Sequence, residues 1–168
     1  AMDIDAAGLP FLQGLTPPAG SKSVEELKQI VSWAQRPFIL KGIMTARGAE
    51  KALEAGASGI VVSNHGGRVL DHCPATAEVL PEIVDAVGGK LTIFVDGAIR
   101  SGMDMFKALA LGADAVLIGR PFVTTVYGGG EEGVQLYVQK LKAELADTMR
   151  MCGAHSLAEI KRSMLFGF

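Results

Sequence analysis

The chain has 168 residues, a formal net charge of -2 and a hydrophobic fraction of 49%. This near-neutral balance argues against a protein that binds nucleic acid through its net charge. No apolar run approaches the roughly 20 residues that cross a bilayer, and nothing resembles a signal peptide, so we expect a soluble, cytoplasmic protein.

Apolar runs rich in β-branched residues alternate with amphipathic segments along the chain. The runs are predicted as strands at 1–6, 38–43, 59–64, 91–96 and 115–119. The segments between them repeat apolar residues every three or four positions, which predicts helices at 24–35, 45–55, 76–87 and 101–111. Ser23 and Glu26 have the spacing of a capping box, and Gly56 and Gly112 are predicted to close two of these helices.

The C-terminal part of the chain begins with a glycine-rich stretch at 127–133. It follows no strand and lacks the spacing of a dinucleotide-binding loop, so we predict a simple connection. It leads to a long amphipathic helix at 134–151 and a short one at 157–160. Residues 15–20, rich in proline and glycine, are predicted as a loop between a strand and its helix.

This order of elements predicts βα units with parallel strands. An eight-unit barrel of such units needs about 250 residues, whereas this chain has 168. We therefore expect an α/β fold in which residues 1–168 are the C-terminal part, about five βα units, of a TIM barrel. Because the sequence opens on Ala1 in a strand-like segment, we expect the N-terminal strands of that barrel to lie outside it.

The most informative stretch, 60–68, carries an apolar strand directly into Ser63, His65 and Arg68. A histidine can accept a proton near neutral pH. An arginine three residues further on can hold a carboxylate through two parallel hydrogen bonds. The pairing suits chemistry on an organic acid, although a strand-end histidine can equally be a packed side chain.

Charged residues also follow the neighbouring strands. Lys41 closes an otherwise apolar run, where a charge is seldom placed unless it is paired or functional. Asp96 closes the next such run, and an arginine follows it four residues later. Polar groups gathered at the ends of parallel strands are typical of the active face of a (β/α) barrel.

Asp3 and Asp5 are two positions apart in the first predicted strand. Both side chains are therefore expected on the same face, towards the barrel interior. One of them is expected to face His65, and a purely structural pairing with Lys41 is the alternative.

Metal binding and disulfides are not expected. Cys73 and Cys152 are too few for a disulfide framework, so both are predicted as reduced thiols. His72 and His155 lie near these cysteines without the recurring spacing of a ligand set, so we predict no metal site.

Five motifs occur in one order along the chain: Lys41-Gly42, the run 63–68, Pro74-Ala75-Thr76, the run 96–100 and the run 108–120. In order and spacing they resemble the C-terminal half of the FMN-dependent α-hydroxy-acid oxidase and dehydrogenase family. This family includes glycolate oxidase, lactate oxidase and flavocytochrome-type lactate dehydrogenases. The resemblance runs from about residue 38 to residue 160.

The resemblance implies FMN as the cofactor and a role for each residue at the reacting end. His65 is implied as the catalytic base and Arg68 as the clamp on the substrate carboxylate. Lys41 is implied beside the pyrimidine edge of the flavin, where its charge stabilises the reduced ring. Asp5 is the implied partner of His65, whereas Asp3 stands where the family has a threonine.

The same resemblance implies the contacts of the rest of the cofactor. Ser63 is implied as a flavin contact and Asp96 as a partner of the ribityl hydroxyls. The phosphate is expected at four residues that follow two strands, where backbone N–H groups and charge are available: Gly97, Arg100, Gly119 and Arg120. Ala98 replaces a glycine of the family in this turn.

For the intact protein the resemblance implies oxidation of an L-2-hydroxy acid, lactate-like, to the 2-oxo acid. Oxygen, a quinone and a cytochrome stay open as electron acceptors. This chain alone is expected to be inactive, because the family's first three strands supply tyrosines of the substrate site and half of the flavin pocket. Two alternatives are another FMN barrel enzyme and a flavin- or phosphate-binding barrel fragment without redox activity.

Open strand edges are predicted at 1–6 and 115–119. Unpaired backbone groups at such edges favour pairing with another strand. We therefore expect either pairing with the missing N-terminal half of the barrel or self-association into an oligomer.

Overall fold

The computed structural model of the chain describes residues 1–168 except 7–8, 10–11, 13, 17–19 and 168. The described residues form one sheet of five parallel strands in the order β1-β2-β3-β4-β5. The strands are β1 (Met2–Asp3), β2 (Ile39–Ile43), β3 (Gly59–Val62), β4 (Thr92–Val95) and β5 (Ala115–Val116). Each strand therefore pairs with the next in the chain, as successive βα units require.

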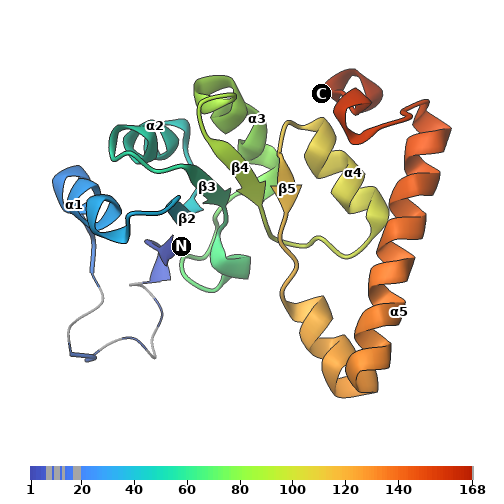
Figure 1. Ribbon diagram of the computed structural model, residues 1–168, viewed down its shortest axis with the longest axis horizontal. Helices are drawn as coiled ribbons and strands as arrows, with labels where there is room; N and C mark the ends of the chain where they lie inside the picture. The colour runs from blue at the N-terminus through green and yellow to red at the C-terminus, as the bar shows by residue number, and fades with distance from the viewer. Residues whose placement is uncertain (7–8, 10–11, 13, 17–19, 168) are drawn as a thin grey trace.

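A helix connects each strand to the next. These helices are α1 (Val24–Ala34), α2 (Ala46–Glu54), α3 (Thr76–Val87) and α4 (Gly102–Ala110), and β5 is followed by α5 (Arg120–Cys152). Short 3-10 turns are η3 (His65–Gly67), η4 (Leu157–Glu159) and η5 (Arg162–Met164). In Figure 1 helices α1 to α4 follow one another along one side of the strands, with α5 beyond α4. The predicted alternation is confirmed, and the fold is a five-unit part of a TIM barrel; the loop predicted at 15–20 includes residues outside the described ones.

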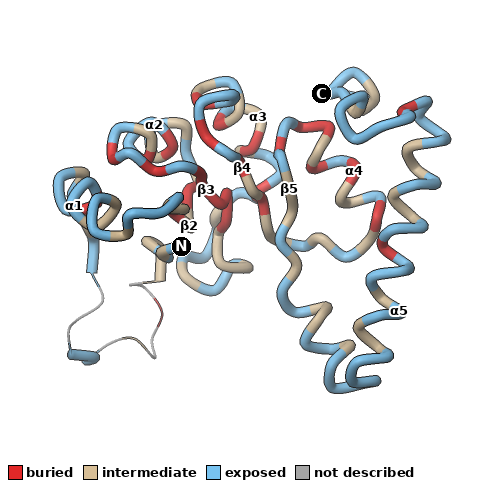
Figure 2. Tube along the Cα trace, viewed as in Figure 1, coloured by how far each residue is buried: buried red, intermediate tan, exposed pale blue. Residues whose placement is uncertain are grey.

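The core lies between the central strands and the helices. Five strand side chains are at most 2% exposed: Leu40, Ile60, Val62, Ile93 and Val95. They form one apolar cluster with residues of α3 such as Leu80 and Ile83, and Figure 2 shows the buried segments concentrated there. Burial of this alternating face is the main source of stability for the sheet.

The opposite face of the sheet is less completely covered. Ile39, Val61, Phe94 and Leu117 lie on it and line a cavity of about 420 Å³. Leu117 is 40% exposed. In a closed barrel this face would point to the interior, where side chains from all strands fill the space.

The two edge strands are shorter than the sequence predicts. β1 ends at Asp3 and β5 at Val116, although single hydrogen bonds extend both ladders: Ile4 N–H donates to Lys41 O (2.9 Å) and Leu117 N–H to Val95 O (2.9 Å). Among the described strands, each edge strand pairs on one side, so fewer bonds hold its ends in extended conformation.

The predicted connection at 127–133 is wrong in most of its length. Helix α5 runs from Arg120 to Cys152 and is interrupted at Gly130, whose φ of 54° and ψ of -139° are not helical. The chain reverses there, so the two arms of α5 lie side by side (Figure 1). A Cβ atom at Gly133 would lie 2.5 Å from Thr125 O, so glycine allows the close contact of the arms. Packing between the arms stabilises helix in a segment whose glycines disfavour it.

The predicted residues at the helix ends are confirmed. Ser23 N–H donates to Glu26 Oε2 (2.7 Å) and Glu26 N–H to Ser23 Oγ (3.1 Å), which is the expected capping box. Gly56 and Gly112 follow the ends of α2 and α4 with φ of 83° and 104°. Among the described helices, none is long and apolar enough to cross a membrane.

Candidate active site

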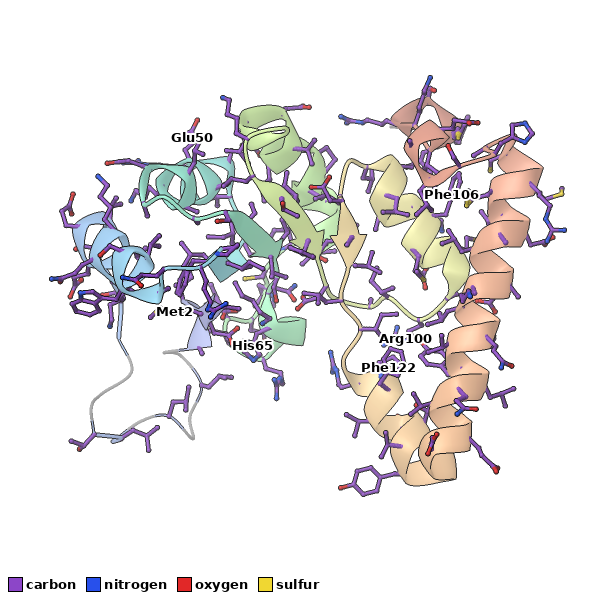
Figure 3. The ribbon with its side chains drawn as sticks, viewed as in Figure 1. Met2, Glu50, His65, Arg100, Phe106 and Phe122 are labelled. Atoms are coloured by element: carbon purple, nitrogen blue, oxygen red, sulfur yellow. The ribbon has the colours of Figure 1, made fainter. Side chains whose placement is uncertain are left out.

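The candidate site lies at the carboxyl ends of the strands. Because parallel strands end at the same edge of a sheet, Lys41 of β2 and the residues that follow β3 and β4 meet there. Figure 3 shows His65 and Arg100 at this edge, below the strands, with Glu50 and Phe106 on the other side of them. A cavity of about 710 Å³ opens at the edge, and its charged lining residues are Lys41, His65, Arg68, Asp96, Arg100 and Arg120.

His65 begins the 3-10 turn η3 that follows β3, and it contacts the segment that follows β1. Its Nδ1 atom lies 3.2 Å from Asp5 Oδ1 and 4.0 Å from Asp3 Oδ1. The side chains of His65 and Asp5 are 15% and 14% exposed, whereas that of Asp3 is 43% exposed. The structure therefore places Asp5, the residue expected from the sequence, within hydrogen-bond distance of the imidazole.

The backbone that presents the imidazole is held in an uncommon conformation. His65 has a φ of 55°, in the left-handed region that non-glycine residues seldom adopt. Its N–H donates to Ser63 Oγ (3.1 Å), and Asn64 Oδ1 accepts from Gly67 N–H (3.2 Å). Asn64 Nδ2 also donates to Pro74 O (3.2 Å). These bonds offset the cost of the turn, and they assign Asn64 a structural part that the sequence did not indicate.

Ser63 lies behind the turn that carries His65. Its side chain is fully buried, and the described residues that line the cavity do not include it. Its hydroxyl contacts the backbone of His65 instead. In this structure Ser63 therefore supports the histidine turn from behind.

Gly42 makes room for the carboxylate that reaches His65. Its φ is 103°, and a Cβ atom there would lie 2.6 Å from Asp5 Cγ. No side chain fits at this distance, and the backbone conformation itself favours glycine. The Lys41-Gly42 motif therefore supplies a charge and the space beside it.

Lys41 lies between carboxylates from two other strand ends. Its Nζ atom is 2.8 Å from Asp3 Oδ1 and 3.9 Å from Asp96 Oδ2, and its side chain is 22% exposed. Among the described residues, Asp96 Oδ1 and Asp5 Oδ2 are buried oxygens without a hydrogen-bond partner. Buried acceptors of this kind normally have a partner, so both oxygens are suited to a hydroxyl of a bound molecule.

Arg68 lies on the exposed side of the same mouth. Its Nε donates to His65 O (3.2 Å), and it lines the cavity together with the imidazole. The sequence spacing of three residues thus does bring both side chains to one opening.

The turn after β4 approaches the cavity through its backbone. Gly97 and Ala98 have φ of 96° and 59°. Thr76 Oγ1 donates to Asp96 O (2.6 Å), and a Cβ atom at Gly97 would lie 3.0 Å from that hydroxyl oxygen. Thr76, which carried no expected role, therefore anchors the turn that ends in Arg100.

Two segments with an arginine border the cavity: the turn after β4, which ends in Arg100, and the start of α5, which carries Arg120. Gly119 precedes Arg120 and a Cβ atom there would meet nothing within 4 Å, so Gly119 borders open space. Arg120 Nη2 donates to Gly66 O (3.4 Å), which joins this segment to the turn that carries His65. A helix N-terminus with two arginines close by is well suited to a phosphate.

A possible metal-ligand group is present at the histidine. Asp3, Asp5 and His65 each offer a ligand atom within 4.8 Å of the others, and it is the one such group found among the described residues. Hydrogen bonding of His65 and the Asp3–Lys41 ion pair account for this proximity. His72 is exposed and is not part of this group; its Nε2 atom lies 3.8 Å from Asp71 Oδ2. The lack of a metal site stays a prediction.

Together, the parallel (β/α) units and the histidine, lysine and arginine groups gathered at one end of the strands define part of a (β/α) barrel protein with a charged cavity at that end. The family model of FMN-dependent dehydrogenases matches residues 12–166. The peroxisomal (S)-2-hydroxy-acid oxidase GLO4 of Oryza sativa subsp. japonica is 48% identical over 149 residues, covering 89% of this chain and 40% of that protein. Glycolate oxidase of Spinacia oleracea is 47% identical over 137 residues, covering 79% of this chain and 37% of that protein. The chain belongs to the FMN-dependent dehydrogenase family and spans about two fifths of the length of these relatives.

A solved structure shares the arrangement of the described elements. Mandelate oxidase superposes with a TM-score of 0.82 at 42% identity, and the match covers 86% of this chain and 42% of that chain. The resemblance inferred from the five motifs is thereby confirmed at the level of family and fold.

FMN is the cofactor of this family, and the residues at the strand ends fit it. Asp96 Oδ1 is a buried acceptor without a partner among the described residues, as a ribityl hydroxyl requires. Gly119 leaves the wall of the cavity open beside Arg120, as a phosphate requires. The donors and acceptors therefore match a molecule with hydroxyls in its middle and a dianion at one end.

Proposed function

We propose that the intact protein oxidises an L-2-hydroxy acid to the 2-oxo acid with FMN as the electron acceptor, and that lactate-like acids are its substrates. The observation that carries the proposal is the His65–Asp5 contact of 3.2 Å at the mouth that Arg68 also lines. The named relatives act on glycolate or other (S)-2-hydroxy acids, which supports the substrate class. When bound, FMN supplies a two-electron acceptor.

His65 moves the proton in this proposal. With Nδ1 held by Asp5, the imidazole is oriented so that Nε2 takes a proton from the substrate. The Asp5 carboxylate then stabilises the imidazolium that forms, because opposite charges at this distance favour the protonated ring. Asp5 thus acts both as an orienting group and as a counter-ion.

Arg68 and Lys41 stabilise two negative charges in this proposal, that of the substrate carboxylate and that of the reduced flavin. The planar guanidinium of Arg68 binds the substrate carboxylate through two hydrogen bonds, which a lysine could not do. Lys41, held by Asp3 at 2.8 Å, faces the flavin ring and stabilises negative charge on it. Ser63 contacts the flavin only if the buried hydroxyl turns away from the backbone of His65.

The other end of the cavity holds the cofactor in place. Asp96 accepts from the ribityl hydroxyls, and the phosphate lies among Gly97, Arg100, Gly119 and Arg120. Both arginines line the cavity, and the glycines let the backbone N–H groups approach an anion closely.

Residues 1–168 are in this proposal one domain, which requires N-terminal strands to complete the barrel. The inner face of the sheet is apolar and lines the 420 Å³ cavity, and β1 and β5 have an open edge each among the described strands. Such edges favour pairing with the missing half or with a second copy, so we expect an oligomer. Sedimentation of the purified chain as a monodisperse monomer would contradict this expectation.

The chain by itself is proposed to be inactive or nearly so, because half of the flavin pocket comes from those strands. The alternative for this chain is therefore flavin or phosphate binding without a redox step, which the open sheet favours. Membership of the FMN-dependent dehydrogenase family disfavours the other alternative, an FMN barrel enzyme of different chemistry. A cytoplasmic location is also part of the proposal, although the plant relatives named GLO4 are peroxisomal, and cell fractionation tests it.

The visible spectrum of the chain with added FMN tests these proposals. The chain is titrated with FMN, and L-lactate, glycolate and (S)-mandelate are then added without oxygen. Bound flavin that bleaches with an acid shows the redox step, and the acid that bleaches it fastest identifies the substrate class. Flavin that binds without bleaching supports the alternative for the chain alone, and no binding would overturn a flavin site formed by these strands.

The His65→Asn variant is the matched control for the redox step. Its FMN affinity is expected to stay within about twofold, because His65 is at the substrate end. In the enzyme completed by its N-terminal strands, bleaching by the substrate is expected to slow by about a hundredfold or more, the usual contribution of a general base. Equal bleaching by the variant and the wild type would exclude His65 as the base.

A further inference from the structure

Tyr137 joins the two cationic segments of the cavity. Its hydroxyl, on the second arm of α5, donates to Arg100 O at 2.9 Å, although the two residues are 37 positions apart. Its ring meets that of Phe122, on the first arm, edge to face with a centroid distance of 5.1 Å and an interplanar angle of 72°. One side chain thus contacts both the segment of Arg100 and the segment of Arg120, and Figure 3 shows Arg100 and Phe122 in this region.

The backbone of Arg100 is held at both of its polar groups. Its N–H donates to Asp104 Oδ2 (3.1 Å), and its carbonyl oxygen accepts from Tyr137. The preceding turn contains Ala98 at a φ of 59°, a left-handed conformation that is unfavourable for a non-glycine residue. A turn under this strain keeps its shape only where its surroundings hold it.

Arg100 and Arg120 carry like charges and line the same cavity. Placing two cations at the spacing of a phosphate requires that their backbones be fixed before the anion arrives, since ordering them on binding weakens affinity. Tyr137 supplies this link on the side of α4 and α5, whereas Arg120 is tied to Gly66 on the other side.

The hydroxyl of Tyr137 is suited to donate its hydrogen bond to Arg100 O at every pH near neutrality. Burial raises the pKa of Tyr137 above its ordinary value of 10.0, and the nearby carboxylates of Glu144 and Asp104 raise it further. The hydroxyl therefore keeps its proton over the whole neutral range and stays bonded to the carbonyl of Arg100.

We propose that Tyr137 is a positioning residue for the phosphate end of the cofactor: its hydroxyl fixes the Arg100 segment against α5 and so sets the separation of Arg100 and Arg120. The inference rests on the proposed function, in which these arginines bind the phosphate of FMN. Tyr137 acts through Arg100 and is not required to touch the cofactor itself.

The test compares Tyr137→Phe with Tyr127→Phe. The first variant keeps the ring and its contact with Phe122 but removes the hydroxyl. The second removes the same atom from a tyrosine that is 90% exposed. Both are titrated with FMN and with riboflavin, which has the same ring and ribityl chain but no phosphate.

Tyr137→Phe is expected to weaken FMN binding by about three- to tenfold, the range that one lost hydrogen bond accounts for, and to leave riboflavin binding unchanged. Tyr127→Phe changes neither. An unchanged ratio of FMN to riboflavin affinity in Tyr137→Phe overturns the inference. A loss of affinity for both flavins also overturns it, because that result indicates a general structural role.

Amide hydrogen exchange separates a failure of this inference from a failure of the proposed function. In the ligand-free chain, the N–H groups of Arg100 and Ser101 are expected to exchange at least about threefold faster in Tyr137→Phe than in Tyr127→Phe. If the wild-type chain binds neither flavin, its proposed flavin site fails, and exchange alone then decides the part played by Tyr137. Equal exchange in the two variants overturns the inference in either case.

Discussion

Asp5 Oδ1 lies 3.2 Å from His65 Nδ1, although 60 residues separate the two in the chain. The contact joins the segment after β1 to the segment after β3 across Gly42 of the intervening strand β2. The pairing of β1, β2 and β3 therefore brings the two side chains together. Substitution of Asp5 by asparagine, which has nearly the same shape, tests the charge alone.

Asp5→Asn is expected to slow anaerobic flavin reduction by about a hundredfold, because an amide orients the ring but does not stabilise the imidazolium. Asp3→Asn is the matched control, since Asp3 Oδ1 lies 4.0 Å from the same nitrogen and its side chain is 43% exposed. Its effect is expected to stay below about tenfold. Stopped-flow absorbance of the enzyme completed by its N-terminal strands gives both rates, and equal rates in the two variants would contradict the assignment of Asp5.

Gly42→Ala is expected to destabilise the chain by more than about 3 kcal/mol. The positive φ costs about 1–2 kcal/mol, and the new Cβ atom would lie 2.6 Å from Asp5 Cγ. Gly89→Ala is the control, because Gly89 has a φ of 74° but a Cβ atom there would meet nothing within 4 Å. Urea unfolding gives both free energies.

The double variant Gly42→Ala/Asp5→Ala lacks Asp5 Cγ, the atom that the new Cβ atom meets most closely. It is expected to recover part of the loss caused by Gly42→Ala, since contacting residues are energetically coupled. Equal destabilisation by Gly42→Ala and Gly89→Ala would show that Asp5 moves away freely.

Ala98→Gly is expected to raise the free energy of unfolding by about 0.5–1 kcal/mol. Relief of the strain at a φ of 59° outweighs the greater flexibility of glycine in the unfolded chain. Ala158→Gly, at an exposed alanine that is not among the positive-φ residues, is expected to lower it by about the same amount. A loss of stability in both variants would mean that the turn after β4 carries no strain.

The capping box of α1 makes a pH-dependent contribution to stability. The pKa of Glu26 is lowered from 4.5, first because its carboxylate accepts from the backbone of Ser23. A lowered pKa in the folded state gives stability that is present above about pH 4.5 and lost as the pH falls through the folded value. Glu26→Gln is therefore expected to be less stable than the wild type at pH 7 and to approach it near pH 3.

Urea midpoints across this range measure the difference. Glu132→Gln, which removes an exposed glutamate of α5, controls for the change in net charge. A difference between Glu26→Gln and the wild type that persists unchanged at low pH would assign the effect to packing rather than to charge.

Local signals in the sequence were sufficient for the order of the elements. Strand and helix depend mainly on residues within a few positions, so apolar runs at 59–64 and 91–96 and the Ser23–Glu26 pair predicted β3, β4 and the start of α1. Parallel pairing then placed Lys41, His65 and Asp96 at one edge without further information.

The tertiary structure decided the features that join distant segments. The family resemblance already implies Asp5 as the partner of His65, and the register Asp3↔Lys41 pairs the other aspartate with the lysine of β2. The first arm of α5 is helical because the second arm packs on it, in spite of its glycines. Tyr137 enters the site because α5 reverses at Gly130, and such long-range contacts depend on the whole packing rather than on any local pattern.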